Sequence, residues 1–145
     1  MIHPDIPKSE QVMAFTHLGY DCTVLMGPFT INGYIVLPEG HPWLQHDSLE
    51  GVDFIDVHGG VTYHQGRVIG FDTNHSGDGH HPDSAGYQCA IEHGLNIPRG
   101  IPWSWEEVAE ETERLAEQAR EAAYYDTYLQ ITQGQHKEDK EGDDK

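Results

Sequence analysis

The residues best suited to chemistry lie in a glycine-rich stretch between His58 and Asp83. His58 precedes a Gly-Gly pair, and the segment from Asp72 to Asp78 places one aspartate three residues before His75 and another three residues after it. Aspartate and histidine both bind zinc and manganese, and glycines let a backbone wrap closely around an ion. This spacing predicts a site in which His58, Asp72, His75 and Asp78 bind a divalent metal (zinc or manganese) or act as catalytic groups.

Two other interpretations of these four residues stay open. Without a metal, an aspartate and a histidine can form an acid–base pair, because imidazole changes charge near neutral pH and a carboxylate can orient the ring. In a purely structural interpretation, the polar side chains of the loop make turns and serve only each other. The pattern matches neither an HExxH helix nor an EF-hand loop, and the chain has no GxxxxGK[ST] or GxGxxG phosphate loop.

Candidate binding residues lie in two further segments. His41 and Trp43 follow a predicted strand, in a loop where we expect an aromatic side chain to be exposed and available to a ligand. Thr62 and Tyr63 follow the Gly59-Gly60 pair and complete the predicted binding set.

The elements that must position these residues are short strands and one long helix. Strands are predicted by apolar runs at residues 21–26, 34–37, 52–58, 61–64 and 67–72. The turn signals are Asn32-Gly33, Gly59-Gly60 and Gln65-Gly66. Strands joined by such short turns indicate an antiparallel meander, since parallel pairing would need long crossovers. Residues 73–86 show no apolar periodicity and are predicted to form a loop, and residues 87–101 are predicted to hold a short helix.

The helix is predicted to begin at Ser104, which has Glu107 in capping-box register. One face repeats apolar or small residues at helical spacing: Trp105, Val108, Thr112, Leu115, Ala119 and Ala122. The opposite face carries glutamates from Glu106 to Glu121. The sequence therefore predicts an α+β fold, an antiparallel meander sheet packed against a C-terminal amphipathic helix. The predicted organisation is an N-terminal arm (residues 1–14), a single α+β domain (15–132) and a disordered polar tail (133–145).

Charge and composition narrow the classes of partner. The 145 residues include 25 Asp and Glu against 8 Lys and Arg, a formal net charge of −17, which disfavours direct binding to nucleic acid. No apolar run is long enough to predict a membrane span, and the first residues do not resemble a signal peptide. The only cysteines, Cys22 and Cys89, form no disulfide framework or CxxC motif. We therefore expect a cytoplasmic protein with reduced thiols.

Several motifs together resemble a family of small proteins found in tailed bacteriophages and prophages. They are Gly33-Tyr34, Leu37-Pro-Glu-Gly-His-Pro-Trp43, Val57-His-Gly-Gly-Val-Thr-Tyr63, Ile69-Gly-Phe-Asp-Thr-Asn-His-Ser-Gly-Asp78 and Glu113-Arg-Leu-Ala-Glu-Gln118. The resemblance covers roughly residues 30–120. It implies a phage accessory protein acting in the cytoplasm of the infected bacterium, but no particular activity. It singles out His41, His58, Thr62, Asp72, His75 and Asp78, whereas His80, His81 and Asp83 lie outside its pattern.

Two functional hypotheses follow. In the first, the His/Asp site belongs to a small hydrolase, with or without a bound metal, that acts on a small molecule in the infected host. In the second, the protein is a non-catalytic acidic binder that blocks a host protein or sequesters a small ligand, with the glutamate face of the helix as the contact for a basic partner. The sequence does not predict an oligomeric state.

Overall fold

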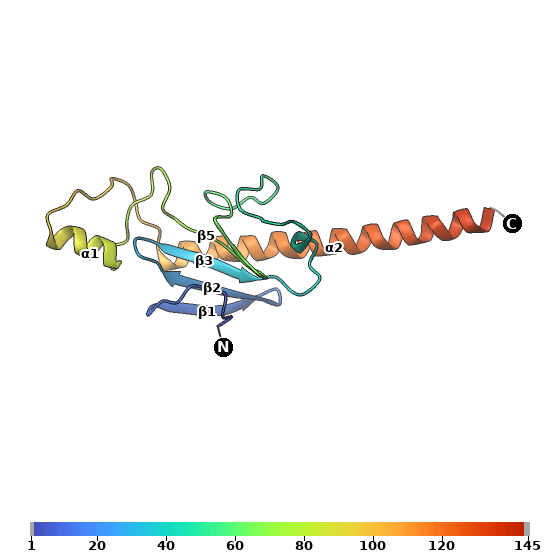
Figure 1. Ribbon diagram of the computed structural model, residues 1–145, viewed down its shortest axis with the longest axis horizontal. Coiled ribbons are helices and arrows are strands. Elements are labelled where there is room, and N and C mark those ends of the chain that lie inside the picture. The colour runs from blue at the N-terminus through green and yellow to red at the C-terminus, as the bar shows by residue number, and fades with distance from the viewer. Residues whose placement is uncertain (1, 144–145) are drawn as a thin grey trace.

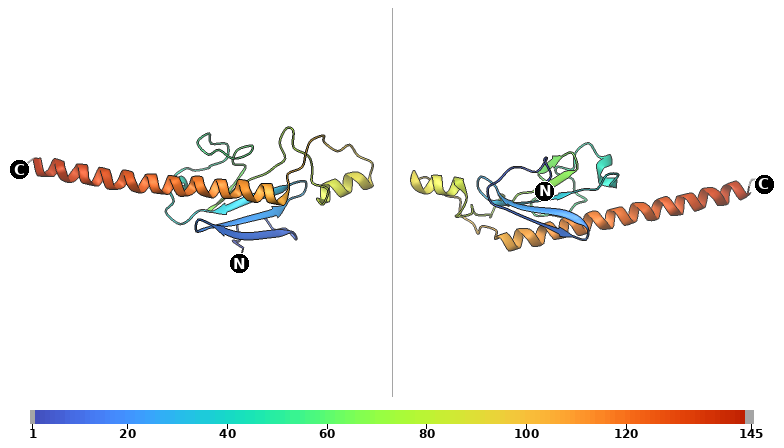
Figure 2. Two further views of the ribbon diagram at one scale, coloured as in Figure 1. Left: turned by 180° about the vertical axis from the view of Figure 1, so that it is seen from behind. Right: turned by 90° about the horizontal axis from the view of Figure 1, so that it is seen from below.

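The fold is a five-stranded antiparallel sheet with one long helix across a face (Figures 1 and 2). A computed structural model describes the backbone of residues 2–143 and the side chains of residues 2–134. The elements are β1 (Val12–His17), β2 (Tyr20–Met26), β3 (Ile31–Val36), the 3-10 helix η1 (Pro42–Gln45), β4 (Tyr63–Gln65), β5 (Val68–Phe71), α1 (Ala85–Glu92) and α2 (Trp105–Asp143). The predicted α+β class is confirmed.

The strands follow the order β1-β2-β3-β5-β4, with every neighbouring pair antiparallel. The first three strands form a meander, and β5 then pairs with β3 while β4 takes the edge. The predicted Gln65-Gly66 turn joins β4 to β5, since Gln65 lies opposite Val68. Because β1 begins at Val12, the sheet includes the last three residues of the segment predicted as an arm.

The core lies between the sheet and α2. Cys22, Val24 and Met26 alternate along β2 and belong to the main buried cluster, together with residues of β3, β5 and α2. A smaller cluster contains Leu25 and Tyr34, and the N-terminal arm covers it through the buried side chain of Ile6. The arm is thus a cap on part of the sheet.

The predicted start of α2 is confirmed. The Ser104 hydroxyl accepts from the Glu107 backbone N–H, and the Glu107 carboxylate accepts from the Ser104 N–H, both at 3.1 Å. This reciprocal pair is a capping box. The predicted apolar stripe is buried from Val108 to Ala119. Farther on, α2 leaves the sheet and projects alone (Figure 1). The segment predicted to be a disordered tail falls on this end of the chain; of it, residues 144–145 lie outside the described residues, as do the side chains of 135–143.

The predicted strand at residues 52–58 is wrong. The segment is irregular, and its backbone is hydrogen-bonded by polar side chains of α2 in place of a neighbouring strand. The Gln118 amide accepts from the Asp56 N–H at 2.8 Å and donates to the Asp56 carbonyl at 2.7 Å, and Arg114 donates to the same carbonyl at 2.6 Å. Gly59-Gly60 consequently joins no hairpin.

The predicted turn at Asn32-Gly33 is also wrong, because both residues lie inside β3. A Cβ atom at Gly33 would overlap Thr112 of α2 and the Phe71 ring, so this glycine allows helix and sheet to approach closely. The turn before β3 is closed instead by the Gly27 N–H, which donates to the Thr30 carbonyl at 2.8 Å.

Among the described residues, no helix has the length and apolar character needed to cross a membrane.

Candidate functional site

The four predicted site residues, His58, Asp72, His75 and Asp78, lie together, and we call them the His/Asp cluster. His58 belongs to the irregular segment beside α2, and Asp72 directly follows β5. His75 and Asp78 close a turn in which the Asp78 N–H donates to the His75 carbonyl at 2.9 Å. An isolated parallel bridge between Asp78 and Ile101 holds this turn beside the segment that leads into α2. The cluster therefore joins segments that are far apart in sequence.

Asp78 is the centre of the cluster. Its Oδ2 accepts from the His58 ring Nε2 at 2.7 Å and from the His75 backbone N–H at 3.0 Å. Its Oδ1 accepts from the indole Nε1 of Trp103 at 3.1 Å. The carboxylate is buried, with 8% of the residue exposed. Both of its oxygens accept hydrogen bonds from the protein, as buried polar groups usually do.

These donors keep Asp78 ionised. Burial by itself would raise the pKa of this carboxyl, but the hydrogen bonds from His58, the His75 N–H and Trp103, with the charge of His58, lower the pKa below its ordinary value. A charged Asp78 can only accept hydrogen bonds, so the facing Nε2 of His58 must carry a proton.

His58 is held from several sides but keeps one ring nitrogen free. Its backbone N–H donates to the Glu111 carboxylate of α2 at 2.8 Å, and its ring lies 4.4 Å, between centroids, from the Trp103 ring. With Nε2 directed at Asp78, Nδ1 has no hydrogen-bond partner among the residues described, and the side chain is 27% exposed. When the ring is neutral, this nitrogen is an oriented proton acceptor.

The second pair of the cluster is Asp72 with His75. The Asp72 carboxylate turns the loop, accepting from the Asn74 N–H at 3.0 Å, and its Oδ1 lies 2.9 Å from the His75 Nε2. That distance suits an ion pair. Nevertheless, the buried Nε2 makes no hydrogen bond in the described part of the chain, because a hydrogen bond requires a suitable angle as well as a short distance.

The His75 ring packs against the backbone of Gly59, where a Cβ atom would overlap it. Its centroid is 5.6 Å from that of His58, with the two rings nearly perpendicular. The two His/Asp pairs are therefore neighbours. In the described residues, no three His, Cys, Asp or Glu side chains are arranged to hold a metal ion. The predicted zinc or manganese site stays a prediction.

The predicted binding residues His41 and Trp43 lie in the core, so the expectation of an exposed aromatic there is wrong. The ring of His41 bridges two backbone groups: Nδ1 accepts from the Trp43 N–H at 3.0 Å, and Nε2 donates to the Ala119 carbonyl of α2 at 2.7 Å. Only 3% of His41 and 6% of Trp43 is exposed. Desolvation by burial lowers the pKa of His41, although the bond to Ala119 opposes this shift.

The other predicted binding residues, Thr62 and Tyr63, are half-buried near the edge of the sheet. The Thr62 N–H donates to the Gly70 carbonyl at 3.0 Å. The Tyr63 hydroxyl donates to the Asp5 backbone carbonyl, and its ring packs edge-on against Tyr34 at 5.2 Å. The observed contacts of Tyr63 therefore fasten the N-terminal arm to the sheet.

The neighbouring polar residues outside the family pattern have contacts of their own. The His80 ring lies 4.8 Å from the Phe29 ring, and the His81 backbone N–H donates to the Phe29 carbonyl at 2.8 Å. Asp83 donates its N–H to the His81 ring at 3.1 Å. These contacts position the loop before α1.

Two residues of the site were missed by the sequence analysis, Trp103 and Glu111. Trp103 stands just before the capping box and Glu111 is on the first turns of α2, so both are positioned by the well-defined start of that helix. Their only sequence signal is their closeness to Ser104.

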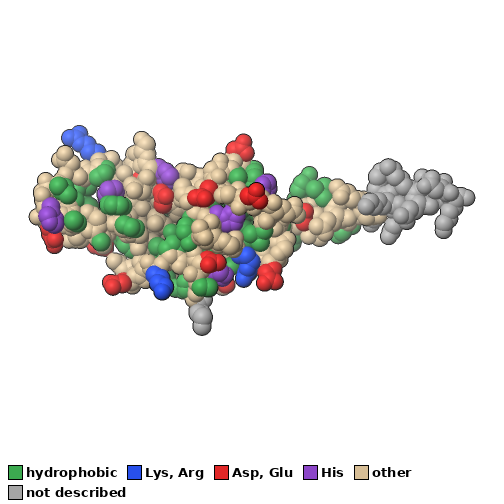
Figure 3. Space-filling model, viewed as in Figure 1, with side chains coloured by type: hydrophobic (Ala, Val, Ile, Leu, Met, Phe, Trp, Pro, Cys, Tyr) green, Lys and Arg blue, Asp and Glu red, His purple; other side chains and the backbone are tan. Residues whose placement is uncertain are grey.

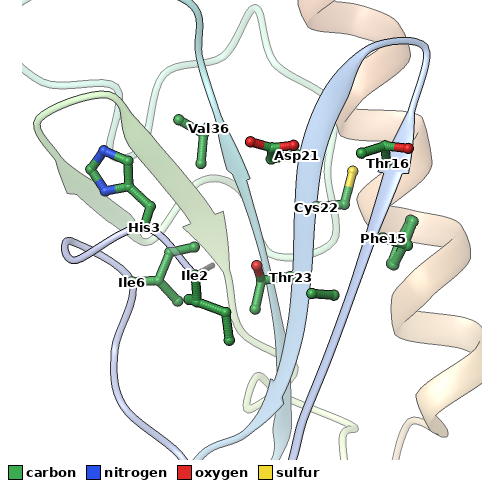
Figure 4. A pocket seen from close by; sticks show the side chains of 10 residues that line it. Ile2, His3, Ile6, Phe15, Thr16, Asp21, Cys22, Thr23 and Val36 are labelled. Carbon is green, nitrogen blue, oxygen red and sulfur yellow. The ribbon is translucent and has the colours of Figure 1, made fainter.

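The structure also has a hollow of about 390 Å³ between the N-terminal arm and strands β1 to β3 (Figure 4). Ile2, His3 and Ile6 of the arm line it, with Thr23 and Val36 of the sheet among others. None of the predicted site residues lies there. We place the candidate site at the His/Asp cluster because that is where oriented titratable groups converge.

Comparisons with known proteins return no match to a family model, a curated protein or a solved structure.

Proposed function

We propose that the His/Asp cluster is the acid–base site of a small hydrolase that acts on a small molecule. The observation that carries the proposal is the His58–Asp78 pair: a buried, ionised carboxylate 2.7 Å from one ring nitrogen, with the other nitrogen unpartnered in the described residues. A carboxylate fixes the tautomer and orientation of an imidazole in this way.

In the proposed reaction, Nδ1 of His58 takes a proton from a water molecule as the water oxygen bonds to the carbonyl carbon or phosphorus of the ligand, and the leaving oxygen takes up a proton as its bond to that atom breaks. Asp78 stabilises the imidazolium that forms and is itself held in place by Trp103 and the His75 N–H. His75, whose ring centroid is 5.6 Å from that of His58, is the second group of the proposed acid–base site. The setting implied by the family resemblance, the cytoplasm of an infected bacterium, is part of the proposal.

The test is hydrolysis of a panel of chromogenic carboxylic esters, phosphomonoesters and phosphodiesters. We expect the wild type to hydrolyse at least one of these classes of substrate. Both His58→Gln and His75→Gln should hydrolyse that class at least about 100-fold more slowly, which is the effect expected from loss of a general acid or base. His93→Gln is the matched control, since His93 lies at the exposed end of α1 and its ring hydrogen-bonds within the described residues to Cys89 alone. Equal activity in all four proteins contradicts the proposal.

The metal-assisted form is tested in the same assay. Activity that chelation abolishes and added zinc or manganese restores would support the sequence prediction of a metal, with the two pairs rearranging around it. Activity that chelation leaves unchanged supports acid–base catalysis by the histidines alone.

An alternative proposal, a non-catalytic acidic binder, is favoured by the surface of α2. Glu106, Glu110, Glu117 and Glu121 are exposed, so a row of carboxylates faces solvent. Capture of a host protein that weakens sharply with salt, and is lost on reversal of these charges but kept in His58→Gln, would support this function over the first.

A further inference from the structure

One row of side chains along α2 changes from acidic to apolar where the helix leaves the sheet. Its residues are spaced three or four apart in the sequence. We call this set the outer row: Glu110, Glu113, Glu117, Glu121, Tyr124, Tyr128 and Ile131. Residues at this spacing lie on one face of a helix. The same face is therefore charged beside the sheet and aromatic beyond it.

The acidic part of the outer row reaches the domain at one point, where Glu117 Oε1 lies 3.0 Å from the ring Nε2 of His17 at the end of β1, whereas the apolar end of the row lies on the side of α2 away from the core. At about 100° per residue, Val108, Leu115 and Ala119, which are buried against the sheet, point to roughly the opposite side from Tyr124 and Tyr128. The apolar end of the row thus does not continue the core. It forms a separate surface that faces away from the rest of the chain.

This apolar end is strongly exposed. Tyr124, Tyr125 and Tyr128 are 62%, 64% and 61% exposed, and Ile131 is 56% exposed. The Arg120 guanidinium lies 5.1 Å from the Tyr124 ring centroid and donates to the Tyr124 hydroxyl at 2.8 Å. Hydrophobic side chains gather on the projecting part of the helix in Figure 3. A contiguous exposed patch of this kind is typical of an interaction surface.

The projecting segment differs from the rest of the chain in charge. Residues 122–134 contain a single charged side chain, Asp126, whereas residues 105–121 contain seven glutamates and two arginines. In a chain with a net charge of −17, most surfaces repel a second copy. The segment around Tyr128 is a surface on which two copies can meet with little repulsion.

The segment also needs support to stay helical. Tyrosine, threonine, isoleucine and glycine are weak helix formers, and a helix of this length without tertiary contacts is marginal in water. Burial of its apolar face against a partner would supply the missing stabilisation.

We propose that the outer rows of two copies pair in an antiparallel homodimer centred near Tyr128. Antiparallel pairing brings the aromatic ends together and keeps the acidic parts of the two rows apart, whereas parallel pairing would align them. The core packs against the other side of α2 and leaves Tyr124, Tyr128 and Ile131 exposed, so the centre of this contact is open to a second copy. The tyrosines and isoleucines of both copies would bury on the order of 1,000 Å², the lower limit for a specific interface, so we expect a micromolar dissociation constant.

Sedimentation analysis of the full chain over a range of concentrations tests the proposal. We expect a monomer–dimer equilibrium that strengthens with added salt, because salt screens the repulsion between acidic chains. Tyr128→Lys should raise the dissociation constant by roughly tenfold or more, since it replaces a central aromatic with opposed charges. Ile131→Lys should act in the same direction. Lysine favours helix more than tyrosine does, so helix unfolding does not account for such a loss.

Gln130→Lys is the matched control. It makes the same change in net charge two residues away, on the polar face of the helix beside Asp126. We expect its dissociation constant to stay within about twofold of the wild type. A wild type that remains monomeric at about 1 mM, or equal effects of Tyr128→Lys and Gln130→Lys, overturns the proposal.

The antiparallel direction has its own test. In a Cys89→Ser background, Glu121→Cys should not form a disulfide between copies, because the two positions lie at opposite ends of the contact. Efficient cross-linking at this position under mild oxidation would show a parallel pair and overturn the proposed arrangement.

Discussion

His41 and His58 both lie in irregular segments beside α2, but the structure uses their rings differently. The His41 ring is buried, with one nitrogen accepting from a backbone N–H and the other donating to a backbone carbonyl. The His58 ring is partly exposed, with one nitrogen facing an ionised carboxylate and the other unpartnered in the described part of the chain. Only the second arrangement leaves a nitrogen available to a ligand.

This difference separates a structural histidine from a candidate catalytic one. A ring whose two nitrogens are both bonded to backbone stabilises the fold and has no lone pair to offer. A ring with one nitrogen on a buried carboxylate is oriented and can still exchange a proton at the other. Both residues were predicted from the sequence to belong to a site, so a sequence pattern alone does not distinguish the two roles.

The largest expected effect on stability comes from replacing the buried ring. His41→Gln should lower the free energy of unfolding by about 3 kcal/mol, because it leaves backbone groups of Trp43 and Ala119 short of a partner and opens space in the core. His58→Gln should cost only about 1 kcal/mol. Denaturant unfolding of the two variants at pH 7 measures both, and equal costs would contradict the proposed division of roles.

The contribution of His41 to the free energy of unfolding should depend on pH. Since burial lowers the pKa of His41, the unfolded chain binds a proton there more readily than the folded chain. The contribution of neutral His41 is fully present above the ordinary histidine pKa of about 6.5 and declines as the pH falls below it. The loss of stability between pH 7 and pH 5 should therefore be smaller in His41→Gln than in the wild type.

Asp78→Asn tests the carboxylate that orients the His58 ring. An amide cannot accept from His58, the His75 N–H and Trp103 as a carboxylate does, so we expect a loss of about 2 kcal/mol at pH 7. Because the pKa of Asp78 is lowered in the fold, its contribution is present above the ordinary carboxyl pKa of about 4 and is lost as the pH falls through the folded value. The difference from the wild type should shrink in acid. A difference that is constant with pH would show that the charge of Asp78 is not what stabilises the cluster.

The parts of the fold that were predicted correctly depend on local signals. The capping box at Ser104 and the buried stripe from Val108 to Ala119 involve residues within a few turns of each other, and both are confirmed. The strand prediction at 52–58 failed because the backbone of this segment is hydrogen-bonded by side chains of α2, such as Gln118, 62 residues from Asp56. A sequence pattern does not reveal a partner at that distance.

The candidate site was also predicted only as far as its local sequence signals allowed. His58, Asp72, His75 and Asp78 were recognised from their types and spacing, and they do lie together. The roles of Trp103 and Glu111 depend on contacts across 25 and 53 residues of sequence. The pairing was not predictable either, because the register of the loops decides which carboxylate meets which ring.

The smallest expected effect comes from the two glycines after His58. Gly59 and Gly60 both have positive φ angles, 69° and 80°, so alanine at either position incurs similar backbone strain. Only at Gly59 would the new Cβ atom overlap the His75 ring; at Gly60 it meets open space. We therefore expect Gly59→Ala to cost about 1 kcal/mol more than Gly60→Ala in denaturant unfolding. Gly59→Ala should also shift the ring resonances of His75 in NMR spectra, whereas Gly60→Ala should leave them in place. If the two variants behave alike, the His75 ring does not rest on Gly59, and the second pair of the cluster loses the contact that holds it beside the first.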